Sequence, residues 1–152
     1  MRVESFESFY SRAGHQVHRA VAVGTGNADL AADATEEAMV RAYERWEKVS
    51  VMANPEGWVY VVAMNWARNR LKRRRYRSNL PVPDVGQDDP QVPDPKLVAT
   101  LRRLPVHQRE VVVARYLLDM SEADMAKAFG VAKGTIKSRL HRGLEALRKD
   151  LS

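Results

Sequence analysis

Residues 121–143 read SEADMAKAFGVAKGTIKSRLHRG, and this stretch combines two helical segments with a glycine turn between them. Ser121 precedes the first segment and Asp124 follows three residues later, a spacing typical of a capped helix start. Gly130 permits a sharp change of chain direction, and a second, basic segment begins after Val131. A short helix, a glycine turn and a second basic helix predict a helix-turn-helix, a motif that proteins use to bind DNA.

The second helix of this motif has an apolar side and a basic side when its residues are projected at about 100° per residue. We expect the buried side to consist of Ile136, Leu140, Leu144 and Leu147. The opposite side carries Ser138 and Arg142, with His141 and Lys137 on one shoulder and Arg139 on the other. This arrangement suits a helix in a DNA major groove, where outward side chains reach base edges and flanking cations contact phosphates. The alternative is a basic helix face that is simply solvated.

The composition of the 152 residues limits the class of protein further. An apolar content of 45% is ordinary for a globular chain, and the net charge of +6 points toward a polyanionic partner. The absence of cysteine excludes disulfides and cysteine-containing zinc sites, and it agrees with a reducing compartment. The apolar run at residues 58–64 is too short to cross a bilayer, and the N-terminus does not resemble a signal peptide. We therefore expect a cytoplasmic chain without membrane insertion.

Proline marks a tether within the chain. Five of the seven prolines fall in residues 78–96, SNLPVPDVGQDDPQVPDPK, and proline at this density prevents regular helix. The same segment is acidic and separates two basic blocks. We therefore expect a flexible, proline-rich, acidic linker at 78–96 that joins small domains at residues 1–77 and 97–152.

The blocks on either side of the linker have few glycines and little strict alternation, which predicts an all-α fold of two small helical domains. Residues 28–48 carry an apolar residue at every fourth position, with Asn27 as the N-cap. A further helix is expected to start at Pro55 and to end near Arg77. In the second block we expect helices at residues 97–103, 107–118, 121–129 and 132–149.

These stretches resemble the extracytoplasmic-function (ECF) family of bacterial sigma factors, and within it the actinobacterial SigE-like subfamily. The family's region 4 resembles residues 134–148, GTIKSRLHRGLEALR, and the segment before it resembles residues 101–131. Region 2.2 resembles residues 29–46, DLAADATEEAMVRAYERW. Regions 2.3 to 2.4 resemble residues 54–75, NPEGWVYVVAMNWARNRLKRRR. The resemblance preserves the order of the motifs over nearly the whole chain.

The resemblance implies a transcription initiation factor that binds the core of bacterial RNA polymerase and directs it to a promoter. In the family, domain 2 recognises and opens the −10 element and domain 4 reads the −35 element. The matching positions imply −35 contacts at Lys133, Thr135, Lys137, Ser138, Arg139, His141 and Arg142. They imply contacts with the clamp of the largest polymerase subunit at Asp33, Glu36, Glu37 and Arg41. Glu36 replaces the more usual glutamine and adds a negative charge to that contact.

Promoter opening needs groups that hold a flipped base, and the family uses the loop that matches residues 47–54 for this purpose. Here that loop contains no aromatic residue, so base capture would depend on polar contacts from Ser50 or Asn54. The residues implied for −10 contact and melting are Ser50, Asn54, Trp58, Asn65, Arg68, Asn69, Lys72 and Arg73. Core packing is the alternative role for Trp58 and for the neighbouring Trp46 and Trp66.

The resemblance also implies further partners and a path for the linker through the polymerase. The family's linker threads the RNA path of the polymerase, a positively charged channel that suits the acidic residues of 78–96. The flap of the polymerase is a second core partner, and an anti-sigma factor is a candidate regulator. We expect no cofactor and no metal. Because the chain stops directly after the segment that resembles region 4, we also expect no C-terminal regulatory extension.

Three other classes of protein explain parts of the sequence. A helix-turn-helix regulator that works without polymerase would account for residues 97–152, but it would carry a ligand or receiver domain where residues 1–77 stand. A sigma-like protein that binds core without initiating is the second alternative. An enzyme is the third, since His15 and His18 share the spacing of metal ligands, but no third ligand or nucleophile constellation accompanies them. We therefore expect no catalytic activity.

Overall fold

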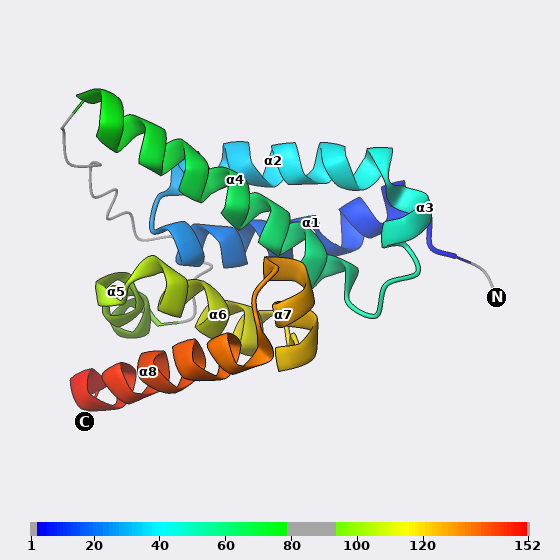
Figure 1. Cartoon of the computed structure of the whole chain (residues 1–152). Coiled ribbons are helices and arrows are strands. Elements are labelled where there is room, and N and C mark those ends of the chain that lie inside the picture. The colour runs from blue at the N-terminus through cyan, green and yellow to red at the C-terminus, as the bar shows by residue number, and fades with distance from the viewer. Residues whose placement is uncertain (1–2, 79–93, 152) are drawn as a thin grey trace.

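The computed structural model describes residues 3–78 and 94–151. Its helices are α1 (Phe6–Thr25), α2 (Ala28–Glu44), α3 (Trp46–Val49), α4 (Pro55–Ser78), α5 (Pro95–Arg103), α6 (Val106–Leu117), α7 (Glu122–Phe129) and α8 (Lys133–Leu151). No strand occurs among the described residues. The predicted all-α fold is thus confirmed, with α1 to α4 in one helical unit and α5 to α8 in the other (Figure 1).

Helix α1 has no counterpart among the helices expected from the sequence. Its apolar residues Phe9, Val17 and Val21 are buried against α2 and α4, but glycines interrupt the pattern along the helix. One of these glycines serves packing, because a Cβ on Gly24 would lie 2.9 Å from the sulfur of Met64 on α4. The residue that weakens the sequence signal therefore permits the close approach of two helices.

Helix α2 is shorter than predicted. Its N-cap is Asn27, as expected, and the side chain of Asn27 accepts a hydrogen bond of 3.0 Å from the backbone of Leu30. The helix ends at Glu44, however, and the backbone breaks at Arg45, so the expected continuation to residue 48 is wrong. Trp46 starts the short helix α3, donates a 2.8 Å hydrogen bond to the Glu4 carbonyl and packs against the Phe9 ring. Its role is core packing, the alternative considered for it.

The predicted linker is too long at both ends. Helix α4 starts at Pro55, as expected, and continues through Ser78. Helix α5 begins at Pro95, where the missing N–H is not needed in the first turn, and Asp94 caps it by accepting from the Lys96 amide at 3.0 Å. Proline at this position therefore starts a helix. The rest of the expected linker, residues 79–93, lies outside the described part of the chain.

The helix-turn-helix is formed by α7 and α8, and its boundaries agree with the prediction to within two residues. Ser121 caps α7 by accepting a 3.0 Å hydrogen bond from the Asp124 amide. Gly130 ends α7 in the left-handed conformation with φ of 71°, which a residue with a side chain rarely adopts. The first helices of this unit, α5 and α6, also lie close to their expected positions.

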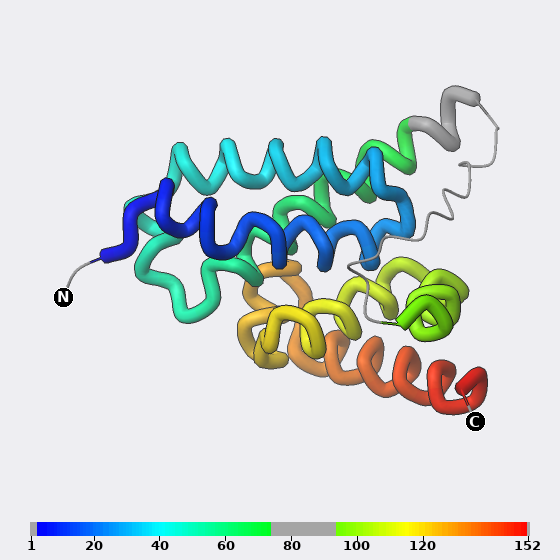
Figure 2. The backbone as a smooth tube through the Cα atoms, turned by 180° about the vertical axis from the view of Figure 1, so that it is seen from behind, coloured from blue at the N-terminus to red at the C-terminus, as the bar shows by residue number. Residues whose placement is uncertain are grey.

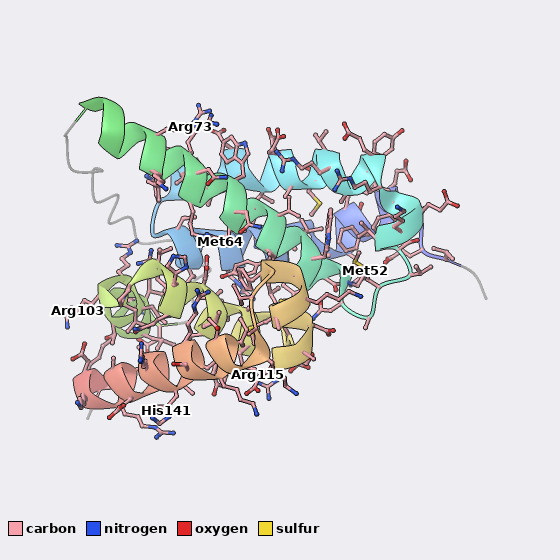
Figure 3. All side chains as sticks on the ribbon, viewed as in Figure 1. Met52, Met64, Arg73, Arg103, Arg115 and His141 are labelled. Carbon is pink, nitrogen blue, oxygen red and sulfur yellow. The ribbon has the colours of Figure 1, made fainter. Side chains whose placement is uncertain are left out.

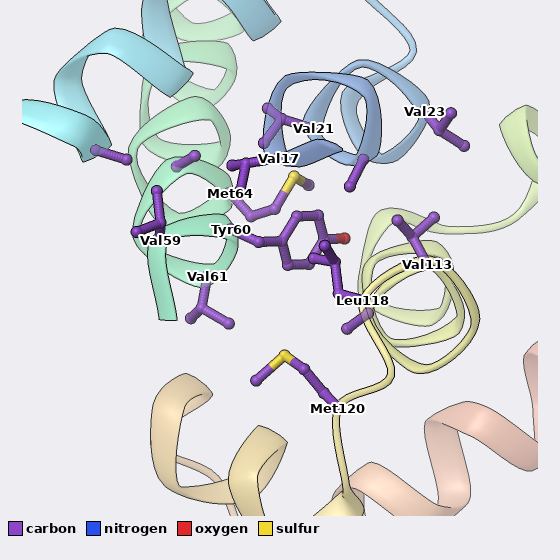
Figure 4. Packing of buried hydrophobic residues seen from close by; sticks show 14 of the residues in the cluster. Val17, Val21, Val23, Val59, Tyr60, Val61, Met64, Val113, Leu118 and Met120 are labelled. Carbon is purple, nitrogen blue, oxygen red and sulfur yellow. The ribbon is translucent and has the colours of Figure 1, made fainter. Parts of the chain in front are cut away.

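The two units pack directly against each other, which the sequence does not predict. Helix α1 contacts α5 and α6, and helix α4 contacts α6 and α7 (Figures 1 and 2). The buried apolar side chains form one continuous cluster across this boundary. Figure 4 shows Tyr60 and Val61 of α4 facing Val113, Leu118 and Met120 of the second unit.

Candidate nucleic-acid interfaces

The outer side of α8 has the predicted arrangement. Ile136 is completely buried and Leu140 and Leu147 are each 7% exposed, so the apolar stripe faces the second unit. Of the residues predicted for DNA contact, the exposed ones are Lys133, Lys137, Ser138, His141 and Arg142, and the half-buried ones are Thr135 and Arg139. Figure 3 shows His141 on the side of α8 that faces away from α1, α2 and α4. The geometry therefore leaves this face open to a large partner.

Helix α8 presents this face from a fixed position on α6. A Cβ on Gly143 would lie 2.8 Å from Val112 of α6, so only glycine permits this close approach of the two helices. On the exposed side, His141 Nε2 lies 3.7 Å from Glu145 of the next turn. The sequence places no acidic residue between Gly130 and Arg142, so the N-terminal half of the helix keeps its positive potential.

A second polar stripe follows α4. Trp58, Asn65, Asn69 and Lys72 are separated by seven, four and three residues, so they lie along one side of the helix. Asn69, Lys72 and the adjacent Arg73 are exposed, whereas Trp58 and Asn65 are half-buried. The guanidinium of Arg68 borders this stripe and donates a hydrogen bond to the side chain of Asn65. The remaining tryptophan of this helix, Trp66, carries the Arg70 guanidinium 5.2 Å from its ring centre.

The loop that precedes α4 is shorter than predicted, and two of its polar side chains form hydrogen bonds within the protein. Helix α3 takes up the first part of residues 47–54, and the Ser50 hydroxyl donates to the Glu47 carbonyl at 3.3 Å. The Asn54 side chain accepts a 2.9 Å hydrogen bond from the Gly57 amide, which caps α4, and donates a 2.9 Å hydrogen bond to the Leu118 carbonyl. In this arrangement both polar atoms of the Asn54 side chain are therefore bonded within the protein.

The loop and Trp58 line a pocket of about 530 Å³ between the two units. On the loop side the walls include Met52, which is 38% exposed, and on the other side they include Met120 and Lys127. Met52 thus supplies an apolar wall in the same pocket as Trp58. The opposite wall comes from α7 and the turn before it.

Further along α4, the carboxylate of Glu110 is completely buried where α6 contacts this helix. The Nε atom of Arg68 lies 2.9 Å from one Glu110 oxygen, and His107 Nδ1 lies 3.4 Å from the other. Burial raises the pKa of Glu110 above its ordinary value of 4.5, while the charges of Arg68 and His107 act in the opposite direction and lower it. Because burial outweighs the charges, the ionised carboxylate is less stable here than it is in water.

Tyr60 and Arg109 complete the polar contacts at this boundary. The Tyr60 hydroxyl donates a 2.8 Å hydrogen bond to the Glu110 carbonyl, and burial raises the pKa of Tyr60 well above its ordinary value, so the phenol remains protonated. Arg109 donates from Nε to the Gly24 carbonyl at the end of α1, at 2.6 Å. Tyr60, Arg109 and Glu110 are not predicted from the sequence, because nothing in the local pattern shows that α4 and α6 touch.

The outer face of α2 holds the residues predicted for polymerase contact. Asp33, Glu36 and Arg41 are exposed, and Glu37 forms an ion pair of 3.3 Å with Arg41. Val40 lies among these residues and is 52% exposed. The exposed aromatic residues Tyr10 and Tyr43 adjoin it and, together with Phe6, Glu36, Met39 and Val40, line a shallow groove of about 300 Å³.

The apolar centre of the α2 face is not among the features predicted from the sequence. A signal for it exists, because Val40 and Tyr43 lie off the stripe that contains Leu30, Ala34 and Ala38. Apolar side chains on the outward side of an amphipathic helix indicate a surface that another molecule covers. The α2 face therefore combines charged side chains with an apolar centre, which is the usual anatomy of a protein–protein interface.

Other kinds of site find no support in the described residues. No group of three or more histidine, cysteine, aspartate or glutamate side chains within 3–78 and 94–151 is arranged to hold a metal ion. His15 and His18 line a shallow groove between α1 and α2 together with Thr35 and Glu36. Across the same part of the chain, every helix is too short or too polar to span a membrane.

Comparison with known proteins agrees with the two units. Residues 9–77 match the family description of sigma-70 region 2, and residues 95–147 match that of sigma-70 region 4. The chain is 32% identical over 149 residues to the ECF RNA polymerase sigma factor SigM of Mycobacterium tuberculosis, an alignment that covers 95% of this chain and 76% of that protein. It is 34% identical over 126 residues to the RNA polymerase sigma-E factor of Streptomyces avermitilis, with coverage of 80% and 70%.

A solved structure shares the fold. The sigma factor RpoE of Bartonella quintana, crystallised with the anti-sigma factor NepR, superposes with a TM-score of 0.83 at 20% identity, over 96% of both chains. Together with the basic helix-turn-helix and the polar stripe of α4, these similarities define the class of protein as a transcription initiation factor. The chain belongs to the ECF sigma factors of RNA polymerase.

Proposed function

We propose that this sigma factor directs RNA polymerase core to promoters with three separate surfaces. The outer face of α2 binds core, the stripe along α4 with the loop before it recognises and opens the −10 element, and the outer side of α8 reads the −35 element. The observation that carries this proposal is the pair of polar, cation-rich faces on two different units of one chain, one of them on a helix-turn-helix.

The proposed −35 contacts divide into two kinds. Ser138 and Arg142 point directly away from the buried side of α8, so they are placed to reach base edges in the major groove. Lys133 and Lys137 are exposed nearer the start of the helix and suit phosphate contacts, which position a protein without reading the sequence. His141 lies between these groups, and Thr135 and Arg139 flank the face.

The proposed −10 contacts also differ along α4. Asn69, Lys72 and Arg73 are exposed and are placed to contact the promoter backbone and bases as the chain stands. Trp58 offers a ring face on which an unpaired base can stack, and Met52 and Ser50 border it. Asn54, Asn65 and Arg68 hold partners within the protein, so we propose that they act after those partners separate.

The family context supports three further statements about this chain. We propose that it acts in the cytoplasm, where bacterial polymerase works, and that it has no catalytic activity of its own. We propose that an anti-sigma factor regulates it, by analogy with the Bartonella protein, which was crystallised with one. We also propose that the acidic segment before Asp94 follows the RNA path of the polymerase.

One prediction separates folding from DNA contact at the start of α8. Gly134 is exposed in the first turn of this helix, and nothing lies within 4 Å of the position a Cβ would take. Gly134→Ala should therefore raise the free energy of unfolding by up to about 0.5 kcal/mol, because alanine is a better helix former than glycine and the first turn gains less than a helix interior. We expect it to lower affinity for duplex DNA carrying the −35 element, because the first turn of a recognition helix lies against the DNA.

Thermal unfolding followed by circular dichroism and DNA binding measured by gel shift test this prediction. The matched control is Gly14→Ala in α1, where the added Cβ would meet only Met39 of α2, at 4.0 Å. The control should gain stability without a change in DNA affinity. Equal DNA affinity for Gly134→Ala and the unchanged chain would show that the backbone at Gly134 does not approach DNA closely.

The proposed function itself is tested by binding to purified bacterial core polymerase. We expect the chain to co-elute with core in gel filtration and to give core a preference for promoter fragments over other DNA. Binding to DNA with the same specificity in the absence of core would instead indicate a helix-turn-helix regulator.

A further inference from the structure

The packing of the two units covers one of the proposed DNA sites and leaves the others open. The side chain of Asn54 is bonded to the Leu118 carbonyl, and Arg68 is paired with Glu110. Trp58 faces Met120 and Lys127 across the pocket between the units. The polar face of α8 and the outer face of α2 stay exposed. Helices α6 and α7 therefore cover the loop before α4 and the first half of α4, where base capture is proposed.

The covering contact is close. A Cβ on Gly57, in the first turn of α4, would lie 2.7 Å from Cγ and Sδ of Met120, a distance that real Cβ atoms essentially never show. Met120 is 2% exposed and Tyr60, one turn further along α4, is completely buried at the same boundary. A side chain at position 57 would therefore require the Met120 side chain to move away from α4. The first turn of α4 is thus shaped to receive the second unit.

The polar part of the contact offsets some of the free energy gained by the apolar part. The carboxylate of Glu110 is removed from water on closing, and burial of an ionised group costs free energy that pairing repays only in part. When the units separate, water solvates both Glu110 and Arg68, and Arg68 becomes available to a DNA phosphate. The same guanidinium therefore has two alternative anionic partners, one within the chain and one on DNA.

We propose that the second unit is an intramolecular cover for the −10 site, which closes over Asn54, Trp58 and Arg68 in the free chain and must swing away before these residues meet a melted strand. The proposal rests on the proposed function of α4 as the −10 site. It adds a closed and an open state of the chain itself, without requiring any bound protein to hold the closed state.

Two variants of the full chain should shift the equilibrium between the closed and the open state in opposite directions. Gly57→Leu places a side chain where Met120 packs, so it should open the cover without changing any charge. Gly57→Cys combined with Met120→Cys should lock the cover closed under oxidising conditions. The built Cβ of residue 57 lies 2.7 Å from Met120 Cγ, so the two Cβ atoms lie at most about 4.2 Å apart, which does not exceed the roughly 3.5–4.5 Å separation of a disulfide. The chain contains no other cysteine, so this disulfide is unique.

Small-angle X-ray scattering reports opening, and gel shifts with radiolabelled single-stranded DNA of mixed sequence report access to the −10 site. We expect Gly57→Leu to have a larger radius of gyration than the unchanged chain and about three- to tenfold higher affinity for single strands, as for an open fraction of about 10–30% in the unchanged chain. The oxidised double cysteine variant should be compact and bind single strands more weakly. Dithiothreitol should reverse both effects.

Two controls fix the interpretation. Duplex DNA should bind all variants alike, because the face of α8 is exposed in the closed state. Met120→Cys alone should not respond to oxidation. Failure of the disulfide to form, or an unchanged radius for Gly57→Leu, would overturn the proposal, because it would show that the closed state is not populated in solution. Opening without a gain in single-strand affinity would overturn the role as a cover, and absence of any single-strand binding would overturn the proposed function of α4 as well.

Discussion

Replacing Val40 with aspartate should lower the affinity of the chain for RNA polymerase core by about 30-fold or more. Val40 is 52% exposed on α2 and lies beside Glu36 and Arg41, with Tyr43 one turn further along. A hot-spot residue at the centre of an interface contributes about 2 kcal/mol or more, and a buried, unpaired carboxylate adds a further penalty. The measurement is a titration of core with fluorescently labelled chain.

The matched control for this variant is Val3→Asp. Val3 is 57% exposed and precedes α1, so the same chemical change occurs outside the α2 face. We expect its core affinity and its thermal stability to equal those of the unchanged chain. If Val40→Asp bound core as tightly as Val3→Asp, the outer face of α2 would not be the core-binding surface.

Arg142→Ala should weaken binding to the −35 element by about 1–3 kcal/mol, or roughly 5- to 150-fold, and should relax the preference at about one base pair. Arg142 points directly away from the buried side of α8 and has no acidic partner on the preceding turn. Lys137→Ala removes the same charge from the shoulder of the helix, so it should weaken binding to all sequences alike.

Binding of both variants to a set of duplexes with single base changes in the −35 element distinguishes these roles. The dependence of affinity on salt should become shallower for Lys137→Ala, because that variant loses a phosphate contact. Base preference should change only for Arg142→Ala. Equal losses on every duplex for the two variants would contradict the assignment of Arg142 to a base edge.

Local patterns account for much of the fold. The stripe of Ile136, Leu140 and Leu147 and the glycine turn at Gly130 predict the helix-turn-helix because both depend only on neighbouring residues. Local patterns fail where a residue has two uses. Pro95 breaks a helix interior but starts α5, and the gap in regular structure at Arg45 follows from the packing of Trp46 onto Phe9.

The candidate site divides in the same way. The exposed residues of α8 and the cationic end of α4 could be named from the sequence because charge and spacing mark them. The partners of Asn54 and Arg68 could not be named from the sequence, because Leu118 lies 64 residues from Asn54 and Glu110 lies 42 residues from Arg68. The exposed apolar centre at Val40 could be recognised only once the buried side of α2 was known. Contacts between units are the part of this protein that local pattern does not predict.

Reconstituted transcription tests the central claim most directly. Purified chain is combined with bacterial core polymerase on a library of genomic fragments, and the 5′ ends of the transcripts are mapped. We predict discrete start sites that share two upstream elements, and loss of those transcripts with Val40→Asp but not with Val3→Asp. Stable core binding without transcripts would contradict the account and indicate a sigma-like protein that does not initiate.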